Sequence, residues 1–173
     1  MRIRWRNFEL PTQVVKDEES YTNTYGKFIV EPFQLGFGTT IGNGLRRVLL
    51  SAIEGTAVTW VRIEGAEHEF SSLDGVYEDV TDIVLQLKRL RVRYHGDGTA
   101  LIRIEKKGPG EVTAADLVGD QNTEIVNTDL HICTLTDEVT FRAEMEVKRG
   151  RGYAPAEENV SEDLDVGAIP IDS

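Results

Sequence analysis

With 173 residues, of which 40% are hydrophobic and 8% aromatic, the chain can bury a real core and is expected to be globular, as one domain or two small ones. Its 30 acidic residues against 19 lysines and arginines give a formal charge of -11, which argues against direct binding of nucleic acid or an anionic membrane. One cysteine excludes an internal disulfide, and without a signal peptide or a membrane-spanning run we expect a cytoplasmic protein.

The first regular segments are a strand and a glycine-rich helix. Residues 22–33 have the composition of a strand that ends at Pro32. The apolar residues that follow recur at helical spacing, so we expect a helix that is capped by Thr39 or Thr40 and ended by Gly55. The apolar stripe of this helix consists of Phe37, Ile41, Leu45, Val48, Leu49 and Ala52.

Glycines inside this helix predict that another polypeptide packs against it. Gly42 and Gly44 each destabilise a helix by about 1 kcal/mol relative to alanine, and close approach of another backbone would offset this loss. At least one of Arg46 and Arg47 must leave the apolar stripe and offer its planar guanidinium to a carboxylate or a carbonyl. A solvated arginine pair on a surface helix fits the spacing equally well.

Two other interpretations of the glycines are weaker. Asn43-Gly44 is a hairpin signal, but the apolar period on both sides is helical. The spacing of Gly36, Gly38 and Gly42 is one residue longer than the dinucleotide fingerprint, and no lysine follows as in a phosphate-binding loop. We therefore expect no nucleotide cofactor here.

The next two elements are a strand and a second helix. Residues 56–64 alternate between apolar and polar, as a half-buried strand does. Residues 74–90 return to helical spacing, with acidic residues early and Lys88 and Arg89 in the last turn, which suits the helix dipole.

The remaining sequence predicts mostly strands. Residues 91–95 and 100–104 flank a glycine turn and predict a hairpin. Residues 139–147 alternate most regularly, whereas 155–165 are acidic and small and predict a loop or a mobile segment. The order of elements therefore predicts an α+β protein with a largely antiparallel sheet.

Enzyme chemistry has little support in the sequence. His68, His95 and His131 are scattered, and no nucleophile elbow is present. His131 and Cys133 could face one way on a strand, but two ligands do not complete a zinc site, and a buried structural cysteine is favoured. We expect no catalytic residue, cofactor or metal site.

Two charged clusters are expected to have ordinary roles. Glu78, Asp79 and Asp82 would lie in the first turns of helix 74–90, and we interpret them as a solvated face rather than a cation site. Residues 148–153, KRGRGY, resemble a short nucleic-acid-binding tract with an aromatic for stacking. Because the chain is strongly negative, a protein partner is favoured for this segment.

Five stretches together resemble one known family. They read GFGTTIGNGLRRVLLSAIEGTAV, EHEFSSLDGVYEDVTDIVLQLKRL, GPGEVTAADL, HICTLTDE and VKRGRGYAPAE. In this order they are similar to the N-terminal domain of the bacterial DNA-directed RNA polymerase alpha subunit, in register over roughly residues 24–173. The glycine helix with its arginine pair, followed at a distance by Arg-Gly-Arg-Gly-Tyr, is the most specific part.

The resemblance implies a non-catalytic assembly scaffold of a nucleotidyltransferase that carries out transcription. In that family the alpha subunit forms a homodimer, which recruits the beta and beta-prime subunits that carry the catalytic metal site. It implies a dimer interface on Phe37, Ile41, Leu45, Val48 and Leu49. It implies docking of beta on Arg46, Arg47 and Asn43, and docking of beta-prime on Lys88, Ile171 and Asp172.

The resemblance also implies the domain organisation. Residues 1–54 would begin the dimerisation subdomain with a strand and a long helix, 55–165 would form an inserted sheet subdomain, and 166–173 would start the return. Family members continue with further strands, a second long helix and a DNA-binding C-terminal module, which this sequence lacks. Either the sequence is a fragment or the missing parts come from elsewhere. Dimerisation by this chain alone therefore stays open, and no direct DNA contact is expected from it.

Two other classes of function are kept as alternatives. A stand-alone protein-binding module unrelated to transcription would share these features but would not co-purify with polymerase subunits. A small-molecule enzyme with an unfamiliar site would need a pocket with convergent polar groups and perturbed pKa values.

Overall fold

The computed structural model describes residues 9–160 and 167–173. It divides the chain into two compact units, the first ending at Leu50 and the second running from Ser51 to Ser173. Part of the predicted loop 155–165 therefore lies outside the described residues.

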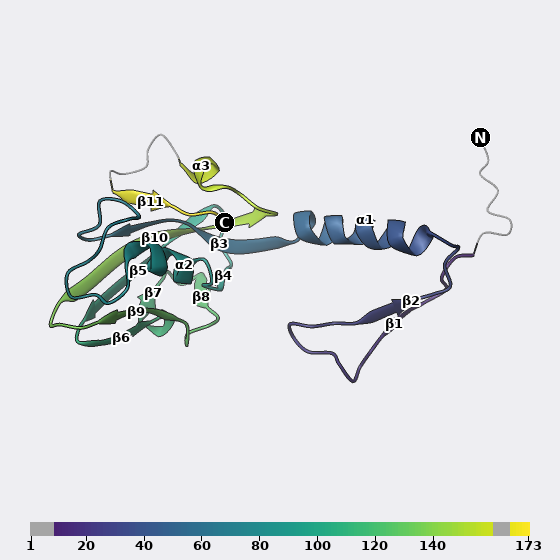
Figure 1. Cartoon of the computed structure of the whole chain (residues 1–173), viewed down its shortest axis with the longest axis horizontal. Helices are drawn as coiled ribbons and strands as arrows, with labels where there is room; N and C mark the ends of the chain where they lie inside the picture. The colour runs from purple at the N-terminus through teal and green to yellow at the C-terminus, as the bar shows by residue number, and fades with distance from the viewer. Residues whose placement is uncertain (1–8, 161–166) are drawn as a thin grey trace. The chain divides into compact units, whose positions relative to one another are not determined.

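The first unit contains a short antiparallel pair of strands, β1 (Val14–Lys16) and β2 (Phe28–Val30) (Figure 1). The predicted strand 22–33 is confirmed only at β2, because the chain before it turns, with the Thr22 N–H donating to the Tyr25 carbonyl at 2.9 Å. The partner strand β1 was not predicted, since a three-residue strand carries too little alternation to stand out.

The predicted glycine helix is confirmed as α1 (Phe37–Ala52). Both predicted ends are wrong. The helix already begins at Phe37, so Thr40 lies inside it and its hydroxyl donates to the Gly36 carbonyl at 3.4 Å. At the other end the helix stops at Ala52, and Gly55 lies within the following strand.

The second unit is built on an antiparallel sheet of five strands in the order β11-β3-β10-β5-β7 (Figure 1). Its strands are β3 (Glu54–Ile63), β5 (Thr99–Lys107), β7 (Leu117–Val118), β10 (Thr140–Arg151) and β11 (Ala168–Pro170). Together with the helices, this sheet confirms the α+β class with largely antiparallel pairing.

The central strand β10 confirms the predicted strand 139–147 and extends it to Arg151. Its buried residues are Phe141, Ala143, Met145 and Val147, and the residues between them are half-buried or exposed. Because side chains alternate across a strand, one face of the sheet is core and the other is charged and accessible.

The predicted strand 56–64 is confirmed as β3, with one interruption of its alternation. Opposite β10 the register shifts, so that Trp60 pairs with Glu146 but Val58 pairs with Val147. Thr59 is the extra residue of this bulge, and its hydroxyl donates to Glu146 Oε1 at 2.7 Å. Val58 and Thr59 are therefore both buried, which strict alternation would not allow.

Two smaller antiparallel pairs complete the strands of the second unit. β4 (Val92–Tyr94) pairs with β8 (Thr123–Ile125), and β6 (Gly110–Thr113), followed by the 3₁₀ turn η1 (Ala114–Asp116), pairs with β9 (His131–Leu135). The predicted hairpin of 91–95 with 100–104 is therefore wrong. Both strands exist, but they pair with strands more distant in sequence.

Helix α2 (Val80–Leu87) is shorter than the predicted helix 74–90. Val76 instead forms a β-bridge with Leu135, and the Tyr77 N–H donates to the Thr134 carbonyl at 2.9 Å. The segment before α2 is thus extended along β9. A four-residue helix, α3 (Ala156–Asn159), lies at the start of the predicted loop 155–165.

The core of the second unit joins α2 to the inner face of the sheet. From α2 it takes Val80, Ile83 and Leu87, which are at most 1% exposed. From the sheet it takes residues of β3, β5, β10 and the tail, among them Val61, Ile102, Met145 and Ile171.

Candidate functional site

The apolar stripe of α1 is accessible along its whole length. All of α1 lies in the described part of the chain, and none of its residues is buried. Leu45 is 56% exposed and Leu49 is 59% exposed. At 3.6 residues per turn, Asn43, Arg46 and Arg47 fall outside this stripe, on the other side of the helix.

The glycines of α1 leave open space at the helix surface. A Cβ atom built on Gly42 or Gly44 would meet no described atom within 4 Å, apart from the helix's own backbone. The close backbone approach expected from these glycines is therefore not made by the described chain itself. The described chain also does not bury the apolar stripe, which we expected another polypeptide to cover.

The three residues suggested for docking beta-prime are brought together in the second unit. Lys88 follows the last residue of α2, and its Nζ lies 3.0 Å from Asp172 Oδ2. The other oxygen of Asp172 accepts the Ala156 N–H at 2.9 Å. Hydrogen bonds from Lys88 and Ala156 lower the pKa of Asp172. Lys88 and Asp172 therefore form one charged surface patch.

Ile171 does not share that surface. Its side chain is 1% exposed and belongs to the core, and its N–H donates to the Thr59 carbonyl at 2.8 Å. Beyond it, Ser173 and Ala154 exchange two backbone hydrogen bonds. Ile171 thus holds the tail in place from the core, whereas the Asp172 side chain is accessible at the surface.

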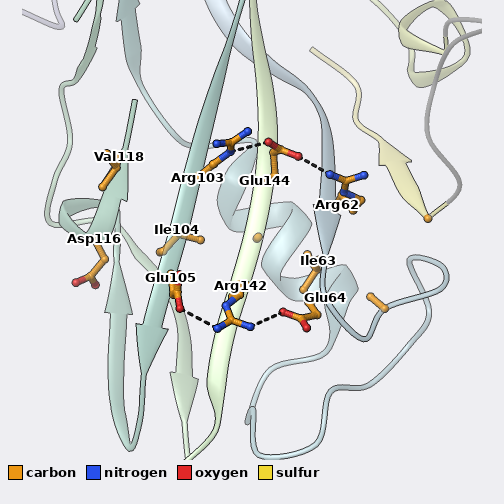
Figure 2. Close-up of a pocket in the computed structure, with 13 residues that line it drawn as sticks. Arg62, Ile63, Glu64, Arg103, Ile104, Glu105, Asp116, Val118, Arg142 and Glu144 are labelled. Atoms are coloured by element: carbon orange, nitrogen blue, oxygen red, sulfur yellow. Dashed lines mark hydrogen bonds and ion pairs between the residues drawn. The ribbon is translucent and has the colours of Figure 1, made fainter. Parts of the chain in front are cut away.

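The outer face of the sheet carries alternating charges over three strands (Figure 2). Glu144 on β10 lies between Arg62, at 2.5 Å, and Arg103, at 2.7 Å. In the row below, Arg142 lies between Glu64, at 3.3 Å, and Glu105, at 2.9 Å (Figure 2). These residues line an open hollow of about 780 Å³.

Within each of the two rows, the opposite charges neutralise one another. Hydrogen bonds from Arg103 and Arg62 lower the pKa of Glu144, and hydrogen bonds to Glu105 and Glu64 raise that of Arg142. Each central charge thus already has two partners of opposite sign. The hollow therefore offers paired ions rather than a nucleophile, base or uncompensated charge.

The arginines of segment 148–153 are also paired within the chain. Arg149 lies 3.1 Å and Arg151 2.5 Å from the carboxylate of Glu54 on the neighbouring strand. The hydrogen bond from Arg151 is the main cause that lowers the pKa of Glu54. The protein partner predicted for this segment stays a prediction, but any partner must meet arginines that already hold a carboxylate.

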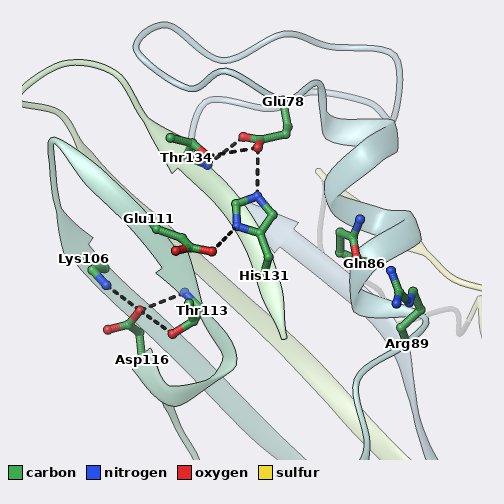
Figure 3. A network of polar contacts seen from close by, with 9 residues as sticks. All are labelled: Glu78, Gln86, Arg89, Lys106, Glu111, Thr113, Asp116, His131 and Thr134. Carbon is green, nitrogen blue, oxygen red and sulfur yellow. Dashed lines mark hydrogen bonds and ion pairs between the residues drawn. The ribbon is translucent and has the colours of Figure 1, made fainter. Parts of the chain in front are cut away.

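A second cluster surrounds His131 (Figure 3). Its Nε2 lies 2.9 Å from Glu78 Oε1, and its Nδ1 lies 2.8 Å from Glu111 Oε1. Glu78 also accepts the Thr134 N–H at 2.6 Å. The prediction of a solvated face is wrong for Glu78, because α2 begins after it and leaves its carboxylate partly buried against β9.

Cys133 is fully buried, which confirms the structural interpretation of this thiol. Burial raises its pKa to about 12, so the thiol stays protonated. A bulge at Ile132 keeps it from facing the same way as His131, which is half-buried. Among residues 9–160 and 167–173, no three His, Cys, Asp or Glu side chains are grouped so as to hold a metal ion.

None of the helices in the described ranges is both long enough and apolar enough to span a bilayer.

Comparison with known proteins gives a consistent assignment. The family model of the RNA polymerase Rpb3/RpoA insert domain matches residues 61–173. The DNA-directed RNA polymerase subunit alpha of Rhodopirellula baltica is 53% identical over all 173 residues, which cover 52% of that relative. The same subunit of Geobacter metallireducens is 50% identical over 173 residues and 51% of its length. That of Symbiobacterium thermophilum is 53% identical over 87% of the chain and 48% of the relative. The chain thus spans about half the length of the relatives it matches.

Proposed function

This chain belongs to the family of bacterial DNA-directed RNA polymerase alpha subunits, and we propose that it acts as a non-catalytic assembly scaffold of such a polymerase. The observation that carries the proposal is the uncovered apolar stripe of α1. Burying each of its large side chains is worth about 1.5 to 3 kcal/mol, which favours association over exposure to water.

Dimerisation is the first role of this scaffold. The occupant of the stripe is a second alpha chain, which contacts Phe37, Ile41, Leu45, Val48 and Leu49. The space beside Gly42 and Gly44 suits the close approach of a second backbone, because no described atom fills it.

Docking of the beta subunit is the second role. Asn43, Arg46 and Arg47 lie outside the apolar stripe, so they stay accessible when the stripe is covered. The guanidinium groups then bind carboxylates or carbonyls of beta, for which their planar fork is suited.

Docking of the beta-prime subunit is the third role. Lys88 and Asp172 form one patch in the second unit, and a partner can reach both charged groups because each side chain is about one third exposed. Ile171 supports this patch from the core.

The scaffold belongs to an enzyme, a nucleotidyltransferase, without performing its chemistry. The hollow on the outer face of the sheet is lined by paired ions, which supports a role in assembly rather than reaction. We also infer a cytoplasmic location, because bacterial RNA polymerase acts in the cytoplasm. A single buried free thiol is consistent with this reducing compartment. Family membership gives no support to a stand-alone module unrelated to transcription.

The direct test is reconstitution with purified beta and beta-prime subunits of the same polymerase. We expect the tagged chain to elute with beta from a size-exclusion column, and to retain beta-prime once beta is bound. Elution of the chain at its own volume, in the presence of a folded beta subunit, would contradict the proposal.

A further inference from the structure

His131 lies where three extended segments run side by side in the second unit. β6 pairs with β9, and on the other side of β9 the segment before α2 is joined by the Val76–Leu135 bridge and by the Tyr77 N–H, which donates to the Thr134 carbonyl. Glu111 comes from β6, His131 from β9 and Glu78 from the third segment (Figure 3). The three side chains therefore connect all three segments.

A bulge in β9 brings the polar groups to one face. Thr113 pairs with His131 and Val112 with Cys133, which leaves Ile132 as the extra residue. As a result Ile132 and Cys133 are both buried, whereas His131 and Thr134 both reach the accessible face. Glu78 can then contact both of them, accepting the Thr134 N–H at 2.6 Å and the Thr134 hydroxyl at 3.1 Å.

With both carboxylates ionised, the geometry favours a charged imidazole. Both ring nitrogens lie within 2.9 Å of a carboxylate oxygen. A neutral imidazole carries one N–H, so one of its nitrogens would face a carboxylate with a lone pair, whereas imidazolium donates to both. The two carboxylates raise the pKa of His131, with Glu78 the larger cause.

The two carboxylates differ in how firmly they are held. Glu78 is 17% exposed and has Thr134 as a second partner, whereas Glu111 is 61% exposed. A ring that loses its proton should therefore keep its single N–H on Glu78 and release Glu111.

Other charged groups near the cluster are already paired. Lys106 on β5 binds Asp116 at 2.6 Å, and Asp116 also accepts the Thr113 N–H at 2.9 Å (Figure 3). On α2, which packs against β9, Arg89 beyond the helix end donates to Gln86 at 3.1 Å. The Cys133 thiol stays protonated at neutral pH. His131, whose pKa is raised above its ordinary value of 6.5, is therefore the group of this cluster that loses a positive charge when the pH is raised.

We propose that Glu78, His131 and Glu111 form a proton-dependent clasp, which fastens the segment before α2 to the β6–β9 pair. When the imidazole loses its charge, the contact with Glu111 is released and the contact with Glu78 weakens from an ion pair to a single hydrogen bond from a neutral ring. The clasp is closed when both carboxylates are ionised and the ring is protonated. Raising the pH opens it, because His131 becomes neutral. Lowering the pH opens it as well, because protonation of Glu78 removes the negative charge that attracts the imidazolium and strengthens the hydrogen bond from the Thr134 N–H.

The test measures amide hydrogen exchange of Tyr77 and Thr134 in this chain, as protection factors relative to the intrinsic rate at each pH. Between pH 6 and pH 9 we expect protection of these amides to fall at least about threefold, because the ion pair that holds Glu78 against β9 weakens to a hydrogen bond from a neutral ring. In His131→Gln, whose side chain cannot take a proton, protection should be lower at pH 6 and should not fall further. The matched control is His95→Gln, at an exposed histidine outside the clasp, which should behave as the parent does.

Two results would overturn the clasp. One is the same pH dependence in His131→Gln and in the parent. The other comes from NMR titration of the His131 ring. Removing the Glu111 charge in Glu111→Gln, a substitution that changes the fold little, should lower the titration midpoint of the ring. An unchanged midpoint would show that Glu111 does not hold the ring.

Discussion

Lys88 and Asp172 lie 84 positions apart in the sequence, yet Lys88 Nζ lies 3.0 Å from Asp172 Oδ2. One residue follows helix α2 and the other follows strand β11, so the contact depends on the packing of the whole second unit. The pair joins two positions that the family resemblance suggested for the same partner.

The first prediction concerns this pair. Lys88→Ala should leave the chain folded, because an exposed ion pair adds little to stability, and should weaken capture of beta-prime at least about threefold by removing a charge from the patch. A pull-down with the assembled beta-containing complex measures this. Arg93→Ala, which breaks the exposed pair with Glu124 elsewhere on the second unit, is the matched control. Equal losses in both variants would argue against a specific patch.

The second prediction concerns the arginine pair of α1. Arg47→Ala should leave the chain folded but weaken binding of the beta subunit at least about fivefold, because arginine is enriched among the interface residues whose truncation costs about 1 kcal/mol or more. Arg47→Lys should recover only part of the binding, since an ammonium lacks the planar fork. Titration calorimetry with purified beta is the measurement. Lys27→Ala, in the same unit, serves as the control, and parental affinity in Arg47→Ala would refute the assignment.

The third prediction concerns the apolar stripe. Leu45→Asp should abolish self-association of a dimerising alpha chain, because it buries a charge without a partner at the centre of the stripe. Sedimentation velocity measures the association state. Leu85→Asp places the same change on an exposed leucine of α2 and should leave the association unchanged. An intact dimer in Leu45→Asp would show that the interface lies elsewhere.

The fourth prediction concerns the core. Ile102 on β5 is fully buried and Leu101 beside it is 45% exposed. Ile102→Ala should lower the free energy of unfolding by about 2 to 5 kcal/mol, since it removes a packed side chain and leaves a cavity. Leu101→Ala should lower it by less than about 1 kcal/mol. Urea unfolding of both variants checks the difference, and similar losses would contradict the sheet orientation.

The fifth prediction concerns pH. The pKa of Glu144 is lowered in the folded state by Arg103 and Arg62, so its contribution to stability is present above the ordinary glutamate value of 4.5 and is lost as the pH falls through the lowered value. Glu144→Gln should lack this loss, about 1 kcal/mol or less because both arginines are accessible. Urea midpoints at pH 7 and pH 3 measure it. Glu138→Gln, at an exposed glutamate, should follow the parent.

Local sequence patterns correctly predicted the elements along which the same pattern of apolar and polar residues continues from end to end. The alternation of 139–147 predicted β10, and the helical period after Phe37 predicted α1, because each pattern spans the whole element. The pattern of 74–90 predicted too long a helix. Val76 fits a helical stripe, but its backbone pairs with Leu135, and this distant contact prevails over local spacing.

Partner choice between strands was harder to predict. The turn at residues 96–98 suggested that β4 pairs with β5, whereas β4 pairs with β8 and β5 with β10 and β7. A glycine turn allows a hairpin but does not require one, since pairing depends on which distant strands bury the apolar faces.

Local sequence patterns could not predict the charged contacts, because the partners are far apart in the sequence. Glu78 was expected to face solvent with Asp79 and Asp82, because its partners His131 and Thr134 lie more than fifty positions away. A signal was present in retrospect, since a histidine that precedes a buried cysteine in a short strand needs polar partners of its own. The Lys88–Asp172 pair was approached only through the resemblance to a family.

The bulge at Thr59 decides on which face of the sheet the side chains of the first half of strand β3 lie. Upstream of this residue, Glu54 faces Arg149 and Arg151, and downstream Val61 and Ile63 face the core. Deleting Thr59 would rotate every upstream side chain to the opposite face, turning Glu54 away from its arginines and Gly55 toward the interior. One inserted residue thus allows a single strand to form ion pairs at its first residue and to face the hydrophobic core at its end.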